Sequence, residues 1–389
     1  MTDHADPVGL YVHIPFCRKK CDYCNFYVIS AEHPARKDFI AALALEIACL
    51  QRPSVFNTIY FGGGSPSLLE PAEFQILLDA VHPCVHPVAE VTLEANPDDV
   101  TIEKLTAWKE GGVNRLSLGA QSFHNNELSA LTRAYDSRQI VQAYDRARNA
   151  GIAQISLDLI FALPGSSRES WLSSLDQAIA LEPDHISAYS LTVEAGTALF
   201  KQVEKGRITP LSDDHDRRQY NLAIDLLEAA GYEQYEISNF ARPGSRSRHN
   251  WDFWSGCDYL GVGPSAEGYY DGQRYSNLPG IRPYVEALFS GQEVPANSMR
   301  LSSLDRACEL AVLMLRRRDG INTARFTRLS GCRVEELFPA AIEQHLADSN
   351  VEWFGTNLRL TRRALPIADA VLSDFALPDQ NRRESGLPT

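Results

Sequence analysis

Residues 11–26 read YVHIPFCRKKCDYCNF and place three cysteines, Cys17, Cys21 and Cys24, within eight residues of one another. A structural zinc site takes four protein ligands, and a disulfide between two of these cysteines would leave one thiol over. An iron–sulfur cube has four corners and normally takes four thiolates. A C-x3-C-x2-C loop with no fourth cysteine nearby therefore predicts a cube with one iron open to a small molecule. The alternative is a loop of unrelated thiols.

The bulk composition is that of a globular protein. At 389 residues the chain can form one large domain and a smaller one, and 44% of its residues are hydrophobic. No apolar run approaches the roughly 20 residues that cross a bilayer, and the acidic first residues do not resemble a signal peptide. We therefore expect a cytoplasmic protein with no transmembrane segment. The net charge of −13 argues against nucleic acid as a partner, and we expect the basic residues 316–318 to form a solvated helix end.

Short β-branched runs alternate with amphipathic stretches from residue 8 to about residue 240. This alternation is typical of βα units around a parallel sheet. Six units predict an α/β fold with an incomplete parallel (β/α)6 barrel, in which functional residues belong at the carboxyl ends of the strands. The expected strands are 10–14, 58–61, 91–94, 115–118, 155–160 and 185–191, and the expected helices are 36–50, 71–81, 101–110, 138–150 and 170–181.

Polar or glycine-rich residues stand at the end of every expected strand, as the barrel rule requires. A purely structural sequence would seldom place them at all six positions. In chain order they are the cysteine loop, Gly62-Gly63-Gly64-Ser65, Glu94, Gln121, Asp158 and Thr192.

A long helix is expected at 213–230, and the chain becomes helical and leucine-rich from about residue 295. Helices at 304–317, 324–329, 334–346 and 364–375 around β-prone pieces at 351–354 and 358–360 predict a small, winged-helix-like C-terminal domain. We accordingly divide the chain into a partial barrel (1–240), a segment that closes the barrel mouth (241–294), the C-terminal domain (295–377) and a disordered tail (378–389).

The motifs together resemble the radical SAM superfamily and, over nearly the whole chain, its oxygen-independent coproporphyrinogen oxidase group. In that superfamily the open iron of a four-iron four-sulfur cluster binds the amino and carboxylate groups of S-adenosylmethionine (SAM). The resemblance implies that Cys17, Cys21 and Cys24 hold the cluster. It is carried by Tyr11-Val12-His13-Ile14-Pro15-Phe16-Cys17, Gly62-Gly63-Gly64-Ser65-Pro66-Ser67, Leu93-Glu94-Ala95-Asn96-Pro97, Gln121-Ser122-Phe123, Asp158-Leu159-Ile160 and Leu163-Pro164-Gly165.

The same resemblance implies a set of SAM-contacting residues. Glu94 suits the SAM ammonium group, and Arg133 suits its carboxylate through a bidentate pair. Gln121 and Asp158 suit the two ribose hydroxyls, and Tyr23 can pack on the adenine. The full set is Tyr11, Tyr23, Gly63, Gly64, Ser65, Glu94, Gln121, Arg133, Asp158 and Thr192.

Two positions depart from the pattern of that group. Ser65 stands where a threonine is usual and keeps the hydroxyl. Tyr135 stands where relatives often carry a histidine after Arg133, so any role of that histidine is in doubt here.

Phe26 separates two branches of the group. The true coproporphyrinogen III dehydrogenases carry a fourth cysteine two residues after the third, where this chain has Phe26. They also have a long N-terminal extension, whereas only 16 residues precede Cys17 here. Both differences resemble the HemW-type haem chaperones instead.

A second motif supports that branch. Residues 248–254 read RHNWDFW and resemble the HNxxYW haem-binding signature, with Phe253 in place of tyrosine. The resemblance implies that His249 is an axial haem ligand and that Trp251, Phe253 and Trp254 flank the macrocycle. The alternative is that His249 caps a loop and the aromatic residues are core. Ser247 stands where relatives often carry a cysteine, so no thioether can form there.

The resemblance therefore implies a cytoplasmic protein that binds a four-iron four-sulfur cluster, SAM and haem. It would deliver haem to an acceptor, which we expect to be a membrane-bound haem protein. The alternative is a radical SAM oxidoreductase, in which reductive cleavage of SAM yields a 5′-deoxyadenosyl radical that abstracts hydrogen from a porphyrinogen. A purely structural role is a third hypothesis.

Overall fold

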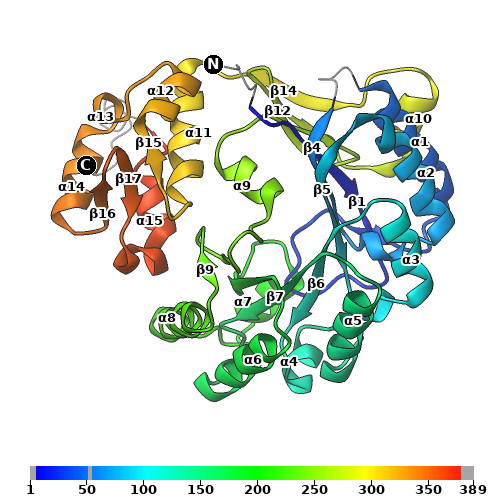
Figure 1. Ribbon diagram of the computed structural model, residues 1–389, viewed down its shortest axis with the longest axis horizontal. Helices are drawn as coiled ribbons and strands as arrows, with labels where there is room; N and C mark the ends of the chain where they lie inside the picture. The colour runs from blue at the N-terminus through cyan, green and yellow to red at the C-terminus, as the bar shows by residue number, and fades with distance from the viewer. Residues whose placement is uncertain (1–5, 51–54, 378–389) are drawn as a thin grey trace.

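The computed structural model describes residues 6–50 and 55–377, and one curved 12-stranded sheet forms its centre. Six neighbouring strands of this sheet are parallel, in the order β1–β4–β5–β6–β7–β8. Figure 1 shows them bent into an open arc. The predicted incomplete parallel barrel is confirmed. Its strands are β1 (Gly9–Ile14), β4 (Phe56–Gly63), β5 (Val85–Ala95), β6 (Arg115–Gln121), β7 (Gln154–Phe161) and β8 (His185–Ser190).

The helices that connect these strands lie on the outer side of the arc (Figure 1). The five predicted connecting helices are confirmed to within two residues at each end. Side-chain caps fix several starts, as at α5, where Asp136 accepts from the backbone N–H of Gln139. The helices of the barrel are α1 (Arg36–Cys49), α2 (Pro71–Val81), α3 (Ile102–Glu110), α4 (Asn125–Ala130), α5 (Ser137–Asn149), α6 (Arg168–Ala180), α7 (Ala198–Glu204) and α8 (Asp213–Ala229).

The parallel strands are apolar on their outer face and polar on their inner face. On β5, Val91 and Leu93 are buried in the core beneath the helices, whereas Thr92 and Glu94 line the inner cavity. On β7, Leu157 is buried in the core while Asp158 lines the cavity. This period of two leaves the barrel interior hollow and polar, unlike closed (β/α)8 barrels whose interior is filled with branched apolar side chains.

The sheet continues beyond the six predicted strands on both sides. Residues 259–262, which we expected in a loop at the barrel mouth, form β11 (Tyr259–Val262), a parallel neighbour of β1. A Cβ atom at Gly261 would lie 2.0 Å from the Glu267 carbonyl oxygen, so only glycine permits the close return of the chain. The other added strands are antiparallel: β12 (Glu267–Tyr270), β13 (Gln273–Asn277) and β14 (Ala296–Arg300) beyond β11, and β10 (Asn239–Ala241) and β9 (Glu233–Gln234) beyond β8.

Two short helices and a small ribbon complete this part of the chain. Helix α9 (Arg248–Trp254) lies on the inner side of the arc, between the sheet and the C-terminal domain (Figure 1). Helix α10 (Ile281–Phe289) packs on α1. Strands β2 (Phe16–Cys17) and β3 (Ile29–Ser30) pair in parallel and begin and close the cysteine loop.

The C-terminal domain is mostly helical, as predicted, and a third strand, β15, joins the two predicted strands in a small sheet. Two of its predicted helices are interrupted at prolines, which cannot donate to the preceding turn. Pro339 separates α13 from α14, and Pro366 lies in a 3-10 turn that precedes α15. The elements are α11 (Ser303–Leu315), β15 (Ile321–Asn322), α12 (Thr323–Ser330), α13 (Val334–Leu337), α14 (Pro339–Ala347), β16 (Val351–Phe354), β17 (Asn357–Leu360) and α15 (Ala368–Ser373).

The basic residues 316–318 are not a solvated helix end, and that prediction was wrong. They join the C-terminal domain to the edge of the barrel, where the Arg318 N–H donates to the Tyr235 carbonyl at 3.0 Å. The Arg317 guanidinium lies 3.8 Å from the centre of the Trp251 ring on α9, and its side chain is only 12% exposed. Burial lowers the pKa of Arg317. Cation–π packing and backbone pairing explain why these arginines are covered.

The division of the chain at residues 240 and 294 stays a prediction, and the predicted disordered tail 378–389 lies outside the described residues. None of the helices within residues 6–50 and 55–377 combines the length and apolar content needed to cross a bilayer.

Candidate functional site

A cavity of about 450 Å³ occupies the inner side of the barrel. It runs from the cysteine loop, at the carboxyl ends of the strands, past the polar inner face of the sheet to α9. Nine residues predicted to contact SAM line it together with the three cysteines of the loop. They are Tyr23, Gly63, Gly64, Ser65, Glu94, Gln121, Arg133, Asp158 and Thr192.

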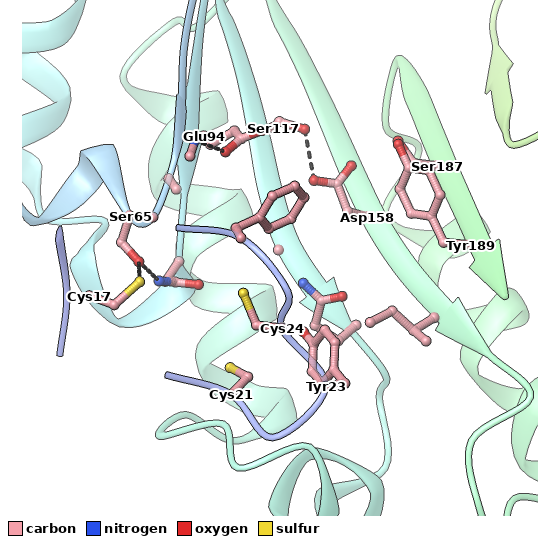
Figure 2. Close-up of a pocket in the computed structure, with 18 of the residues that line it drawn as sticks. Cys17, Cys21, Tyr23, Cys24, Ser65, Glu94, Ser117, Asp158, Ser187 and Tyr189 are labelled. Carbon is pink, nitrogen blue, oxygen red and sulfur yellow. Dashed lines mark hydrogen bonds between the residues drawn. The ribbon is translucent and has the colours of Figure 1, made fainter. Parts of the chain in front are cut away.

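The three cysteines stand on a short loop tied to the end of β1. The Ile29 N–H donates to the Pro15 carbonyl at 2.8 Å, and the Cys24 N–H donates to the Cys21 carbonyl at 3.1 Å. All three thiols are half-buried and unpaired, and Figure 2 shows their sulfurs around the mouth of the cavity. Burial raises the pKa of the Cys17 and Cys24 thiols.

The thiols are spread too widely for a single ion: within the described part of the chain, no cluster of His, Cys, Asp or Glu could hold one metal ion. The three sulfurs nevertheless border one cavity and have no disulfide partner, so their donor chemistry fits a polynuclear iron–sulfur cluster.

Two glycines of the Gly62-Gly63-Gly64 run are required by packing against the cysteine loop. A Cβ atom at Gly63, whose φ is +113°, would lie 2.5 Å from the His13 ring. At Gly64 it would lie 2.7 Å from the Phe16 carbonyl oxygen. The run therefore seats the loop on β1 as well as leaving the backbone open to the cavity.

Glu94 is held at the wall of the cavity by two donors (Figure 2). The Tyr60 hydroxyl donates to Oε1 at 2.8 Å, and the Gly63 N–H donates to Oε2 at 3.2 Å. Burial, with a smaller contribution from the neighbouring carboxyl of Asp158, raises the pKa of Glu94 to about 7. A cationic ligand would favour its ionised form.

Arg133 has a free donor at the cavity. Its Nη1 donates to Asn96 Oδ1 at 3.1 Å, its Nη2 donates to the Tyr23 hydroxyl, and its buried Nε has no partner among the described residues. An unpaired buried donor on a cation is costly, so a carboxylate at this position would be stabilising. Asn96 also donates to Ser65 Oγ at 2.9 Å, and Ser65 Oγ lies 3.5 Å from Cys17 Sγ. A hydrogen-bonded chain thus joins the cysteine loop to Arg133.

Gln121 and Asp158 stand on neighbouring strands. Gln121 has a φ of +66°, an uncommon conformation for a residue with a side chain, and the register of β6 and β7 shifts between Gly119 and Gln121. Such strain often marks a functional position. Asp158 accepts from the Ser117 hydroxyl at 2.8 Å, as Figure 2 shows, and burial raises its pKa.

Two predicted site residues do not line the cavity. The Tyr11 ring stacks on Tyr60 at 6.1 Å, and its hydroxyl is hydrogen-bonded to His13 Nδ1 at 3.0 Å. The His249 ring lies beneath Tyr60 at 5.1 Å, with Nδ1 2.9 Å from Thr58 Oγ1. The roles assigned to both residues stay predictions.

Helix α9, which carries His249, is anchored to the amino-terminal half of β5. The Glu90 carboxylate accepts from the backbone N–H groups of Arg248 and His249, each at 3.0 Å. Ser247 caps the helix through the N–H of Asn250. Burial lowers the pKa of His249 to about 4, so its imidazole is neutral at neutral pH.

The aromatic residues of α9 are half-buried and already packed. Arg317 covers Trp251, and the Arg316 guanidinium lies 4.7 Å from the centre of the Trp254 ring. Phe253 packs edge-on against Trp254 at 4.8 Å. Phe26, in contrast, is 63% exposed beside the cavity mouth.

Sequence reasoning missed several residues of the inner face because it considered only strand ends. The signal that reveals them is the period of two along each strand, with a polar side chain at every second position. One group, which we call the cavity floor, lies toward the amino ends of the strands and α9. It consists of Thr92, Arg115, Ser156, His185, Ser247 and Asn250.

Comparisons with known proteins agree with this architecture. Residues 11–178 match the Radical SAM superfamily, and residues 301–367 match the HemN C-terminal domain. The E. coli enzyme described as "Coproporphyrinogen III oxidase (HemN)" shares the fold, with a TM-score of 0.83 at 21% identity over 96% of this chain and 90% of that chain.

Curated relatives narrow the assignment. A Mycobacterium tuberculosis protein named "Heme chaperone HemW" is 36% identical over 95% of this chain and 94% of its own length. A Bacillus subtilis protein of the same name is 34% identical over 86% of this chain and 89% of its own length. This chain therefore belongs to the HemW family of the radical SAM superfamily.

Proposed function

We propose that this protein is a cytoplasmic haem chaperone that holds a four-iron four-sulfur cluster, SAM and haem and passes haem to an acceptor protein. The observation that carries the proposal is the pair formed by Phe26, in place of a fourth cysteine, and the His249 motif on α9. The name of the HemW relatives supports it. The expected acceptor is a membrane-bound haem protein.

The cluster and SAM would share the cavity mouth. Cys17, Cys21 and Cys24 would hold the cluster, which supplies an open iron for the amino and carboxylate groups of SAM. Glu94 would accept a hydrogen bond from the amino group, and the Nε of Arg133 would donate to the carboxylate. Glu94 accepts from two donors before any ligand enters, so little reorganisation is needed to bind a cation.

His249 has the properties of an axial haem ligand. In the tautomer that donates from Nδ1 to Thr58 Oγ1, the lone pair is on Nε2, for which no hydrogen bond occurs among the described residues. A ligating histidine commonly donates through its other nitrogen in this way, which fixes the tautomer and the ring. Burial keeps the imidazole neutral, the form that binds iron.

The experiment is anaerobic reconstitution of the cluster followed by haem titration of the wild type and His249→Ala. A Soret band that forms in the wild type and is lost in the variant supports the proposal. His86→Ala, which changes a surface histidine on another element, is the matched control and should titrate like the wild type. A wild type that forms no Soret band would overturn the proposal.

One observation favours the second candidate, a radical SAM oxidoreductase acting on a porphyrinogen. The cavity continues past the predicted SAM residues to the cavity floor, which leaves space beside SAM for a substrate. Turnover of coproporphyrinogen III by the reconstituted protein with SAM and a reductant would establish this activity in place of haem delivery.

A further inference from the structure

The cavity floor contains two neighbouring donors that no protein atom satisfies. Thr92 on β5 and Arg115 on β6 are register partners, and both line the cavity. Arg115 is 2% exposed and Thr92 is 1% exposed. Among the described residues, neither Arg115 Nη2 nor Thr92 Oγ1 has a hydrogen-bond partner. Leaving such groups unpaired is unfavourable, most of all for a charged donor, so the pair indicates an acceptor that enters from the cavity.

The second terminal nitrogen of the Arg115 guanidinium, Nη1, is already engaged. It donates to Gln154 Oε1 at 2.5 Å and to the Ser245 carbonyl at 3.1 Å. These contacts restrain the guanidinium and leave Nη2 buried without a partner among the described residues. The geometry is that of a positioned donor rather than of a mobile surface arginine.

Neighbouring groups do not satisfy Nη2. The Glu90 carboxylate lies 3.9 Å from Nη1, and its two oxygens accept from the N–H groups that begin α9. Both nitrogens of His185 are hydrogen-bonded, one to Ser156 at 2.7 Å and one to Tyr235 at 2.9 Å. Burial holds the pKa of His185 well below its usual range, so its ring adds no charge.

We propose that the cavity floor binds a carboxylate group, with Arg115 Nη2–H and the Thr92 hydroxyl donating to its two oxygens. This site is distinct from the one predicted at Arg133 for the SAM carboxylate. A planar monoanion matches one guanidinium N–H and one hydroxyl on adjacent strands. A second negative charge is disfavoured, because Glu90 lies 3.9 Å from Arg115 Nη1 and Asp158 lines the cavity, so a dianionic phosphate fits less well.

The test uses 13C-labelled propionate and its neutral analogue propionamide, titrated by NMR into protein that carries Arg133→Gln. That substitution removes the competing guanidinium whether or not SAM binds. Propionate should bind at least about tenfold more tightly than propionamide, and Arg115→Gln should remove this difference. Thr92→Val keeps the shape of the side chain and should weaken the binding of propionate about threefold.

Thr92→Val also keeps the proposal testable if Arg115→Gln fails to fold. Thr106→Val, on the exposed face of α3, is the matched control and should leave propionate binding unchanged. Equal binding of propionate and propionamide, or propionate binding that is unaffected by Thr92→Val, would overturn the proposal. Ordered water would then be the partner of both donors.

The carboxylate can come from a porphyrin propionate or from a free small acid, and a second comparison separates them. If the carboxylate is a porphyrin propionate, the site identifies part of the haem-binding surface and rests on the proposed function. It predicts that wild-type protein binds haem about tenfold more tightly than haem dimethyl ester, and that Thr92→Val narrows the gap. Equal binding of haem and its ester, with propionate still bound, identifies a free acid. Absence of haem binding would reject the proposed function while the propionate result still decides the carboxylate site.

Discussion

The cysteine loop and helix α9 carry the two motifs on which the proposed function depends, and they differ in how far their side chains are already bonded to the rest of the protein. Around the loop, the thiols form no disulfide and Arg133 Nε has no partner in the described part of the chain, so the cavity mouth offers groups that can bind a ligand. On α9, by contrast, Glu90 already accepts from the backbone N–H groups at the start of the helix. Thr58 is hydrogen-bonded to His249, and Arg317 covers the ring of Trp251. Residues of the loop should therefore affect ligand binding with little effect on folding, whereas residues around α9 should affect both.

The largest expected effect is the loss of the cluster in Cys17→Ser. Removing one of three thiolates should lower the iron content and the visible absorbance of reconstituted protein by at least about tenfold. The free energy of unfolding of the cluster-free protein should hardly change, since the thiol is half-buried. Cys49→Ser, at the exposed end of α1, should retain the full iron content. An equal loss of iron in both variants would show that the cluster does not depend specifically on the cysteines of the loop.

Glu90→Gln tests the other side of the comparison. The substitution weakens the bonds to the start of α9 and leaves Arg115 without its nearby carboxylate, so unfolding should require about 3 kcal/mol less. Denaturant unfolding of the cluster-free protein measures this. Glu233→Gln, which breaks an exposed pair with Arg246, should change stability by less than about 0.5 kcal/mol. A Glu90→Gln protein as stable as the wild type would show that α9 is not tied to the barrel.

The pH dependence of SAM binding tests the residues of the cavity without involving α9. Burial raises the pKa of Glu94 to about 7, and the ionised form is the better acceptor for the SAM amino group. Affinity should therefore rise about tenfold between pH 6 and pH 8, as the carboxyl loses its proton. Calorimetric titration of the reconstituted protein measures it. Glu94→Gln should bind SAM weakly at both values, and a variant that keeps the tenfold rise would contradict the role of Glu94.

Glu46 gives the smallest expected effect and a contrast outside the cavity. It accepts from the Tyr284 hydroxyl at 2.5 Å and the Gly263 N–H at 2.8 Å, and burial raises its pKa to about 7. Because this value is above that of the unfolded chain, the stability it contributes is full below about pH 4.5 and is lost as pH rises through 7. Between pH 6 and pH 8, the free energy of unfolding of the wild type should therefore fall by about 1 kcal/mol more than that of Glu46→Gln.

Glu46 also separates structural from ligand-linked titration. SAM should leave the difference between wild type and Glu46→Gln unchanged, because Glu46 does not line the cavity. Identical pH profiles for the two proteins would mean that Glu46 is not strongly perturbed.

Strand and helix positions were predictable because each βα unit carries its own periodicity and turn residues. The cavity-lining positions of Glu94, Gln121 and Asp158 were predictable because parallel strands bring their carboxyl ends to one edge. Strand β11 was not, since four residues that include Gly261 and are followed by Gly263 carry too weak a pattern. The environment of His249 was also hidden, because it depends on Thr58 and Glu90, which are more than 150 residues away in the sequence.

Arg115 shows a further limit of sequence reasoning. Its unpaired Nη2 results from the register of β5, β6 and β7 and from the return of the chain at Ser245. The period of two along β6 marks Arg115 as a residue of the inner face, but no local pattern shows how its guanidinium is bonded. Only the assembled barrel shows that Nη2 is buried without a partner among the described residues.

The most direct test of the account is the identity of the haem iron's axial ligand. Protein labelled with 15N-histidine, loaded with ferric haem and examined by pulsed electron paramagnetic resonance reports any histidine nitrogen bound to iron. The account predicts a histidine coupling in the wild type that is absent in His249→Ala, although nine of the ten histidines remain. A coupling of equal strength in His249→Ala would contradict it, because another residue would then hold the haem.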